Sequence, residues 1–326
     1  MLTSRTVFIL GAGAHMPYGM LSGEDLTKKI IQLLPTPRDL RAYSHSVHPF
    51  VKTYYSTFGT GVGTRIDKPL VDFQHKLNHS LHSSIDSFLR TYANTISFPE
   101  IGKLAVAMIL SPLELQRSWG KDDLPKGDWL TYLFEAMYKD CHASINDFIS
   151  NNKNVSFVTF NYDRTLEHFM TIKLANTYDT SREEAWNRVK AWNNIIHVYG
   201  SLGAFGVQDL DQAFDPKDPT AYKRSVSSIR LMYEDRQEEQ TIAAAKASIE
   251  QAHTVIFLGF AFDVDNIARL DLTKTCNAKT ILGATRMKLT DVEWERVQRD
   301  MQPAAFTHMG TLNEDSLQFL RNHNVL

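Results

Sequence analysis

The sequence predicts an α/β protein built on a doubly wound parallel sheet, with a helical insertion between the first two strands. Three observations lead to this prediction. Short apolar, β-branched runs alternate with helix-length segments along most of the chain. Glycine-rich or polar turns follow these runs directly, as they do at the carboxyl ends of parallel strands. A long stretch after the first run lacks strand alternation and is punctuated by proline, glycine and helical patterns.

The strand prediction rests on short runs that are rich in apolar or β-branched residues and bounded by turn residues. The first of them, TVFIL, enters a glycine turn at once, which is typical of a buried strand. Helical patterns separate the later runs and imply crossover connections on both faces of the sheet. The predicted strands are 6–10, 155–160, 195–199, 254–258 and 279–282.

The helical segments divide the chain into two predicted parts. Residues 1–34 and 151–326 are expected to form a Rossmann-like nucleotide-binding domain, and residues 35–150 a mostly helical insertion. Prolines and glycines make long regular elements improbable between 35 and 70. The remaining helices are predicted at 24–34, 71–92, 102–110, 129–149, 165–175, 182–191, 236–251, 264–272 and 291–299.

Composition narrows the class of protein. Of 326 residues, 43% are hydrophobic and 22% charged, which is ordinary for a globular protein with a large core. The formal charge of −2 gives no overall attraction to nucleic acid. Two cysteines exclude a disulfide framework and a four-cysteine zinc site. Without a signal peptide or an apolar stretch of about 18 residues, we expect a cytoplasmic protein that does not cross a membrane.

Four turns follow predicted strands and are expected to face one ligand cavity, since the carboxyl ends of parallel strands share an edge. They are 11–13, 161–163, 200–203 and 259–260. Gly11-Ala12-Gly13 is typical of a turn whose backbone approaches a diphosphate. The third glycine of the usual dinucleotide fingerprint would fall at Met16, so a plain strand-to-helix turn remains the alternative.

Polar residues on the next two strands are the candidates for chemistry. Asn161 and Asp163 are two residues apart, so in extended backbone their side chains point the same way. The alternative is that Asp163 caps the following helix while Asn161 forms a turn. His197 and Tyr199 share a strand face by the same spacing and are placed to contact a ribose hydroxyl, although a lone strand histidine is more often a core residue.

One histidine stripe lies outside these turns. His75, His79 and His82 have helical spacing, so the first two are placed to share a metal ion. No cysteine or aspartate completes a ligand set nearby, which favours a polar helix face and no metal.

Taken together, these segments resemble the bacterial sirtuin-like NAD hydrolases associated with antiphage defence. The matching blocks stand in the order of that family and cover nearly the whole chain. They are FILGAGAHMPYGMLSGEDL at 8–26, SIDSFL at 84–89, IGKLAVAMIL at 101–110, SFVTFNYDRTLEHFM at 156–170, IIHVYGSLG at 195–203, VIFLGFAFDVDNIARL at 255–270 and ILGATRMKLTDVE at 281–293.

The resemblance implies a sirtuin-like fold and a role for each matching residue. Asn161 would serve the ribose and the attacking water, Asp163 would hold the nicotinamide carboxamide, and His197 or Tyr199 would act on a ribose hydroxyl. The implied NAD-binding residues are Gly11, Ala12, Gly13, His15, Tyr18, Gly19, Gly200, Ser201, Gly259 and Phe260.

Two positions depart from the sirtuin pattern. His15 stands where that family has serine, and it would contact the diphosphate or narrow the pocket. Tyr199 precedes Gly200, where the catalytic histidine is usual, and His197 lies two residues earlier. Protein deacetylation is disfavoured because the four-cysteine zinc module of deacetylase sirtuins is missing.

The activity that the resemblance implies is cleavage of NAD, as substrate, to nicotinamide and ADP-ribose. An unregulated enzyme of this kind would empty its own cell, so we expect control by a homo-oligomer, a HerA-like ATPase or a short Argonaute. The main alternative is a non-catalytic sensor of NAD or ADP-ribose within a defence complex. Another nucleotide enzyme on a doubly wound sheet, such as a nucleoside hydrolase or dehydrogenase, and a structural scaffold are further alternatives.

Overall fold

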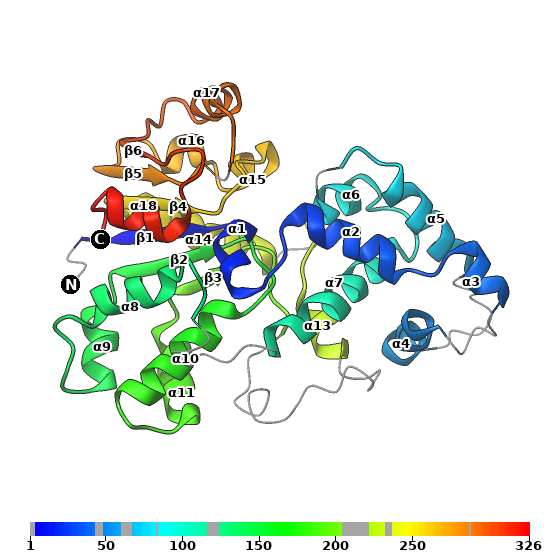
Figure 1. The fold of residues 1–326 in the computed structure, drawn as a ribbon, viewed down its shortest axis with the longest axis horizontal. Coiled ribbons are helices and arrows are strands. Elements are labelled where there is room, and N and C mark those ends of the chain that lie inside the picture. The colour runs from blue at the N-terminus through cyan, green and yellow to red at the C-terminus, as the bar shows by residue number, and fades with distance from the viewer. Residues whose placement is uncertain are drawn as a thin grey trace. The chain divides into compact units, whose positions relative to one another are not determined.

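Six strands form one all-parallel sheet in the order β3-β2-β1-β4-β5-β6, shown in Figure 1. The computed structural model describes residues 4–42, 48–59, 67–82, 84–115, 124–203, 222–231, 237–286 and 288–326. The predicted α/β class and doubly wound sheet are confirmed. The strands are β1 (Thr6–Leu10), β2 (Val155–Thr159), β3 (Ile195–His197), β4 (Thr254–Leu258), β5 (Ile281–Ala284) and β6 (His308–Met309).

The strand register brings the turns of three strands to one level of the sheet. Leu10, the last residue of β1, pairs with Thr159 of β2 and with Leu258 of β4. The strand order reverses between β1 and β4, which is the topological switch point where open α/β sheets bind ligands. The residues that follow these strands therefore meet at the edge of the sheet best suited to a nucleotide.

The chain divides into two compact units, and the sheet lies entirely in the first. This sheet unit comprises Met1–Gly19, Ser118–Val198 and Arg236–Leu326. Its helices are α1 (Ala12–His15), the 3-10 turn η1 (Met16–Tyr18), α8 (Trp129–Tyr138), α9 (Ile145–Asn151), α10 (Thr165–Thr177), α11 (Arg182–Trp192), α14 (Gln237–Gln251), α15 (Val264–Arg269), α16 (Leu272–Thr275), α17 (Asp291–Asp300) and α18 (Ser316–Asn322).

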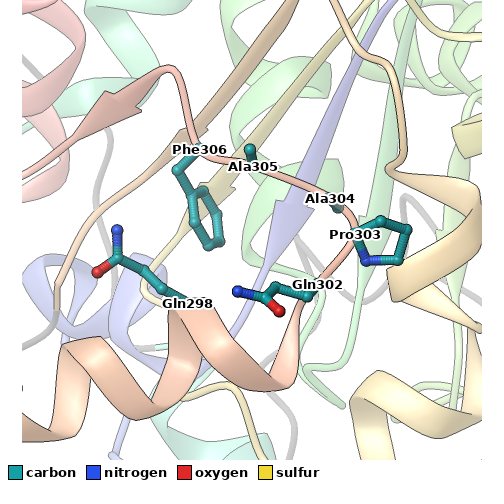
Figure 2. Close-up of a pocket in the computed structure, with 6 residues that line it drawn as sticks. All are labelled: Gln298, Gln302, Pro303, Ala304, Ala305 and Phe306. Atoms are coloured by element: carbon teal, nitrogen blue, oxygen red, sulfur yellow. The ribbon is translucent and has the colours of Figure 1, made fainter.

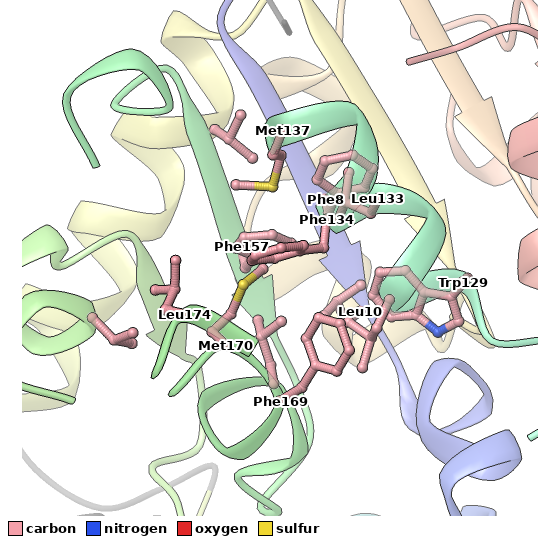
Figure 3. Close-up of a cluster of buried hydrophobic side chains, with 14 of the residues drawn as sticks. Phe8, Leu10, Trp129, Leu133, Phe134, Met137, Phe157, Phe169, Met170 and Leu174 are labelled. Atoms are coloured by element: carbon pink, nitrogen blue, oxygen red, sulfur yellow. The ribbon is translucent and has the colours of Figure 1, made fainter. Parts of the chain in front are cut away.

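Alternate residues of the central strands pack on the helices that cover one face of the sheet, as Figure 3 shows. Phe8 and Phe157, on paired strands, stack with ring centroids 5.5 Å apart. Phe157 also meets Trp192 of α11 edge to face at 6.1 Å. Intervening residues such as Val7 and Ile9 are buried as well. A strand buried on both faces explains why these runs are continuously apolar in the sequence.

The second unit, Met20–Arg117 with Tyr199–Asp235, is helical in its described residues. Its longest helix, α7, packs against each of α2, α4, α5, α6 and α13. Phe73, Phe88 and Phe98 form an aromatic cluster in its core. The helices are α2 (Gly23–Leu33), α3 (Pro37–Ala42), α4 (Pro49–Phe58), α5 (Asp67–Asn78), α6 (Ile85–Thr91), α7 (Phe98–Leu115) and α13 (Tyr222–Ser228).

The division differs from the predicted one, in which 1–34 and 151–326 formed one domain and 35–150 the other. Helices α8 and α9 pack in the core of the sheet, through residues such as Trp129 and Phe148, and so belong to the sheet unit. Conversely, α2 and the segment after Val198 belong to the helical unit. The helices between β1 and β2 are thus divided between the two units.

Several element boundaries were also wrong. The predicted helices 71–92, 129–149 and 264–272 are each two helices, the first of which ends at residue 78, 138 and 269 respectively. The interval 35–70 contains α4, which begins at Pro49. Proline is tolerated there because the first helical residue needs no amide hydrogen. Strand β3 ends at His197, two residues before the predicted end.

No helix in the described part of the chain is long and apolar enough to span a membrane.

Candidate functional site

The switch point of the sheet is a place of very close backbone approach. Gly11 follows β1 and Gly259 follows β4, and the amide of Gly13 donates to the carbonyl of Gly259 at 3.1 Å. A Cβ on Gly259 would lie 1.9 Å from the amide nitrogen of Ala14, and the φ of Gly259 is +60°. A Cβ on Gly11 would lie 2.4 Å from the Gly259 oxygen. Only glycine fits at either position.

These contacts bear on the predicted diphosphate turn, 11–13. Besides the Gly13 amide, that of Gly11 donates to Leu258 at 3.0 Å and that of Ala14 to Gly11 at 3.0 Å. Three amides of the turn therefore bond within the protein, as in the alternative of a strand-to-helix turn. The contact of Gly11, Ala12 and Gly13 with NAD stays a prediction. The amides of Gly11, Gly13 and Ala14 do not support it, because each already donates to a carbonyl of the protein.

Asn161 joins the ends of β1 and β2. Its side-chain amide donates to the carbonyl of Gly11 at 3.1 Å, and its backbone amide bonds to the Thr159 hydroxyl at 3.1 Å. The same amide nitrogen lies 3.1 Å from Nδ1 of His15. Asn161 is 7% exposed. The residue predicted to enter the cavity is thus held at the carboxyl end of β2 and against the glycine turn.

Asp163 and His15 form a buried pair at the same place. Nδ1 of His15 is 2.7 Å from Oδ1 of Asp163, and the two residues are 1% and 5% exposed. Oδ1 also accepts from the amide of Thr165 at 3.2 Å, at the start of α10. Asp163 therefore bonds to the first residue of α10, although the N-cap of that helix is Arg164, and it also contacts a predicted site residue.

The pKa of Asp163 reflects these contacts. Burial alone would raise it, because a carboxylate loses hydration in the interior. The charge and hydrogen bond of His15, together with hydrogen bonds from Thr165, instead lower the pKa of Asp163 to about 2. The site thus holds a buried carboxylate that is ionised at neutral pH.

The ring of His15 is fixed by aromatic neighbours. It stacks on Trp129 at 6.5 Å with a 14° interplanar angle and meets Tyr18 edge on at 6.5 Å. Trp129 is itself tied to the turn, since its indole nitrogen donates to the Ala14 carbonyl at 2.7 Å. The other ring nitrogen of His15, Nε2, is buried and has no hydrogen-bond partner. Buried polar atoms without partners are rare and mark places where a water or ligand bonds.

His197, the predicted site residue of β3, has a different environment. Its Nδ1 lies 2.9 Å from the backbone oxygen of Asn161, and its Nε2 lies 2.7 Å from Oε1 of Glu167 on α10. Burial would lower the pKa of His197, but the charge and hydrogen bond of Glu167 and the Asn161 carbonyl raise it. The second oxygen of Glu167, Oε2, is buried and has no hydrogen-bond partner.

The structure therefore brings together Asn161, Asp163, His15 and His197 with the glycine turn, all within the sheet unit. Glu167 and Trp129 belong to this cluster and were missed. The sequence did contain a sign of Glu167. It is an acidic residue in the first turn of the predicted helix 165–175, four residues after Asp163, and many of its neighbours in that helix are apolar. Nothing local marked Trp129, whose partner Ala14 lies far away in sequence.

Tyr18 and Gly19 have structural partners. The Tyr18 hydroxyl donates to Asp128 at 2.8 Å and accepts from the amide of Leu130 at 2.9 Å, which holds the start of α8. Gly19 ends the 3-10 turn with φ of +81°. Their predicted contact with NAD remains a prediction.

Phe260 packs in an aromatic cluster after β4. Its ring lies 5.0 Å from Phe160, 5.4 Å from Phe257 and 5.1 Å from Phe262, and it is 2% exposed. Its side chain therefore contributes to the core, which leaves its predicted contact with NAD untested.

Tyr199, Gly200 and Ser201 lie in the helical unit. Tyr199 is in a turn, so the argument that it shares a strand face with His197 was wrong. Gly200 has φ of +66° and forms a bridge with Ile229, and a Cβ there would lie 2.1 Å from the Ser228 oxygen. Ser201 donates to the Gly203 carbonyl at 3.3 Å. Each of them has a local structural role.

The histidine stripe does not lie on one helix face, because α5 ends at Asn78 and both His79 and His82 follow it. His75 and His79 stack at 4.3 Å, and His82 instead faces Ser87 at 2.9 Å. Among the residues that the structure describes, no group of three or more potential ligands is arranged to hold a metal ion.

A surface hollow of about 640 Å³ lies elsewhere in the sheet unit (Figure 2). It is lined by Gln298, Gln302, Pro303, Ala304, Ala305 and Phe306. The hollow lies beside the end of α17, in the segment that leads into β6. It has no ionisable side chain in its lining, so it does not compete with the polar cluster as a catalytic site.

No protein-family model and no curated protein matches this chain.

Proposed function

We propose that this chain is an NAD glycohydrolase, which cleaves NAD to nicotinamide and ADP-ribose. The observation that carries the proposal is the buried cluster of Asn161, Asp163 and His15 at the carboxyl ends of β1 and β2. It lies at the switch point of a doubly wound sheet, the usual position of a nucleotide. Asn161 and Asp163 are also the pair that matches the Asn-x-Asp motif of the sirtuin-like NAD hydrolases.

The charge of the cluster suits this reaction. Loss of nicotinamide breaks the bond between C1′ of the ribose and the pyridinium nitrogen, and the electron pair leaves with nicotinamide. Positive charge then develops on the ribose ring. An ionised carboxylate held in a buried site, such as that of Asp163, stabilises this charge more strongly than it would in water. The amide of Asn161 would orient the water that attacks C1′.

The test is product analysis after incubation of the purified protein with NAD. Wild type is expected to release equal amounts of nicotinamide and ADP-ribose. Asn161→Ala is expected to lower the rate by at least about 100-fold, because one positioned polar group is lost from the reacting centre. Equal rates in both proteins would contradict the assignment of the site.

The second candidate is a non-catalytic sensor of NAD or ADP-ribose. It is favoured by one observation, that both ring nitrogens of His197, the predicted acid–base residue, already have protein partners. Calorimetry distinguishes the two functions. Micromolar binding of NAD without any nicotinamide release would support the sensor, and absence of both binding and release would contradict both functions.

The biological setting of the proposal follows from the resemblance alone. It is an NAD-depleting effector in the cytoplasm of a bacterium under phage attack, controlled by self-assembly or by a HerA-like ATPase or short Argonaute. The two cysteines, both free thiols in the structure, suit a reducing compartment. A homo-oligomer is expected in solution, and a mass measurement that finds only monomer, with and without candidate partners, would contradict this part.

A further inference from the structure

Two histidines belong to the candidate site, buried His15 and half-buried His197, and they differ in which ring nitrogens have protein partners. For His197, the backbone oxygen of Asn161 can only accept, so Nδ1 must carry a hydrogen and donate. Nε2 faces Glu167 at 2.7 Å. If Glu167 is ionised, Nε2 donates and the ring is a cation; if Glu167 is protonated, the carboxyl group donates to Nε2. In both cases His197 has no nitrogen left to take a proton from substrate.

The ring of His15 is arranged in the opposite way. Nδ1 lies 2.7 Å from the ionised carboxylate of Asp163, so it carries a hydrogen and donates to Oδ1. The side-chain amide nitrogen of Asn161 donates one hydrogen to the Gly11 carbonyl and lies 3.1 Å from Nδ1, which cannot accept the second hydrogen while it donates to Asp163. In the neutral ring, the lone pair therefore sits on Nε2, which is buried and meets no protein donor.

We infer that His15, oriented by Asp163, is the general base of the reaction, and that His197 is a positioning residue. This inference rests on the proposed NAD hydrolysis. As the bond between C1′ and nicotinamide breaks, a water bound at Nε2 forms the new bond from its oxygen to C1′. Its proton passes to Nε2 of His15, which later returns it to solvent. The balance is one NAD and one water to nicotinamide, ADP-ribose and a proton.

The neighbours of His15 suit this role. A carboxylate on Nδ1 fixes the tautomer in which the neutral ring carries its lone pair on Nε2. Stacking on Trp129 and the edge contact with Tyr18 fix the direction in which Nε2 points. The pair of His197 and Glu167 instead holds the backbone of Asn161, and so positions the amide that would orient the water.

His15→Asn is the variant that tests the inference. The Asn side-chain amide nitrogen can replace Nδ1 as the donor to Asp163, so the fold is kept, but nothing replaces Nε2. The rate of nicotinamide release is expected to fall by at least about 100-fold, while the affinity for NAD measured by calorimetry changes little. The acidic limb of the pH–rate profile should vanish in the residual activity of His15→Asn and persist in that of His197→Gln.

Other outcomes separate this inference from the proposed function. If wild type is active and His15→Asn is equally active while His197→Gln is inactive, His15 is not the base, although NAD hydrolysis stands. If wild type releases no nicotinamide, the proposed function fails. The base assignment is then decided by ¹⁵N spectra of histidine-labelled protein, with His15→Asn and His197→Gln used for assignment. An unprotonated Nε2 on His15 at neutral pH supports the inference, and a doubly protonated His15 overturns it.

Discussion

At the residue scale, the site depends on hydrogen bonds between residues that belong to different strands and to the turns after them. Asn161 contacts the turn after β1 through its side chain and His197 of β3 through its backbone oxygen. Asp163 fixes His15, and Glu167 fixes His197. Two carboxylate–imidazole pairs thus flank one amide. Removing a single member of such a network leaves other buried polar groups without partners, which costs more than the lost hydrogen bond itself.

Asp163 is expected to make stability depend on pH. Its pKa in the folded protein is about 2, below the ordinary value of 3.8. The stability that it contributes is therefore present above about pH 4 and is lost as the pH falls through 2. At neutral pH, Asp163→Asn should lower the free energy of unfolding by about 2 kcal/mol. Melting temperatures of both proteins between pH 2 and 7 measure this, and a gap that stays constant down to pH 2 would argue against it.

Gly259 is expected to be intolerant of any side chain. Its φ is +60° and a Cβ would overlap the backbone of Gly13 and Ala14. Gly259→Ala should therefore destabilise the protein by at least about 3 kcal/mol. Gly59→Ala is the matched control, since Gly59 also has positive φ, +83°, but nothing lies within 4 Å of its Cβ position.

The control should cost less than Gly259→Ala, about 1 to 3 kcal/mol, because it adds only the backbone strain of φ +83° with ψ 160° and no overlap with other atoms. Thermal unfolding of the two variants compares them directly. If both variants lose a similar free energy of unfolding, the backbone at the switch point moves easily to make room for a side chain.

At the element scale, the strands that sequence predicted best are those with the strongest local signals. Strands β1 and β4 were predicted at their observed bounds, because each is a continuous apolar run that ends at a glycine required by backbone contact. Strand β6 has only two residues and offered no periodicity. The helices 129–149 and 71–92 were predicted as single elements because apolar spacing continues across their turns.

The site was predictable only in part, because only some of its residues have a local sequence signal. Period two on a strand end selected Asn161 and Asp163, and the glycine turn selected Gly11 and Gly259. The pairing of His15 with Asp163 joins residues 148 apart in sequence, and no local pattern encodes it. The roles of the two histidines depend on which partner each nitrogen meets, which is a property of tertiary structure.

Helix α8 is held at its start by Tyr18. The hydroxyl accepts from the amide of Leu130 and donates to Asp128, whose carboxylate also accepts from the amide of Thr131. Tyr18→Phe would leave a buried amide without an acceptor and should destabilise the sheet unit by about 2 kcal/mol. Hydrogen exchange at the Leu130 amide should accelerate, and unchanged protection there would show that α8 does not depend on this bond.

At the scale of the whole molecule, the sheet unit supplies both the core and the cluster at the switch point. All four described tryptophans (Trp129, Trp186, Trp192 and Trp294) belong to this unit, so fluorescence of the chain reports on it. Phe157→Leu removes the stacked contact with Phe8 and the edge contact with Trp192. It should destabilise the unit by about 1 to 2 kcal/mol.

The control for that variant is Val292→Ala, because Val292 is 76% exposed, has little burial to lose and belongs to the same unit as the tryptophans. Its effect should stay within about 0.5 kcal/mol. Urea unfolding followed by tryptophan fluorescence compares the two, and an equal effect would contradict the packing described for the core.

A pair of ligand-bound crystal structures tests the central claim, that the cluster at the carboxyl ends of β1 and β2 cleaves NAD. In Asn161→Ala soaked with NAD, we expect the intact dinucleotide, with C1′ of the nicotinamide ribose beside Nε2 of His15. In wild type we expect ADP-ribose at the same place. NAD bound elsewhere, such as in the hollow lined by Gln298 and Phe306, or a crystal of wild type that keeps NAD intact beside His15, would contradict the claim.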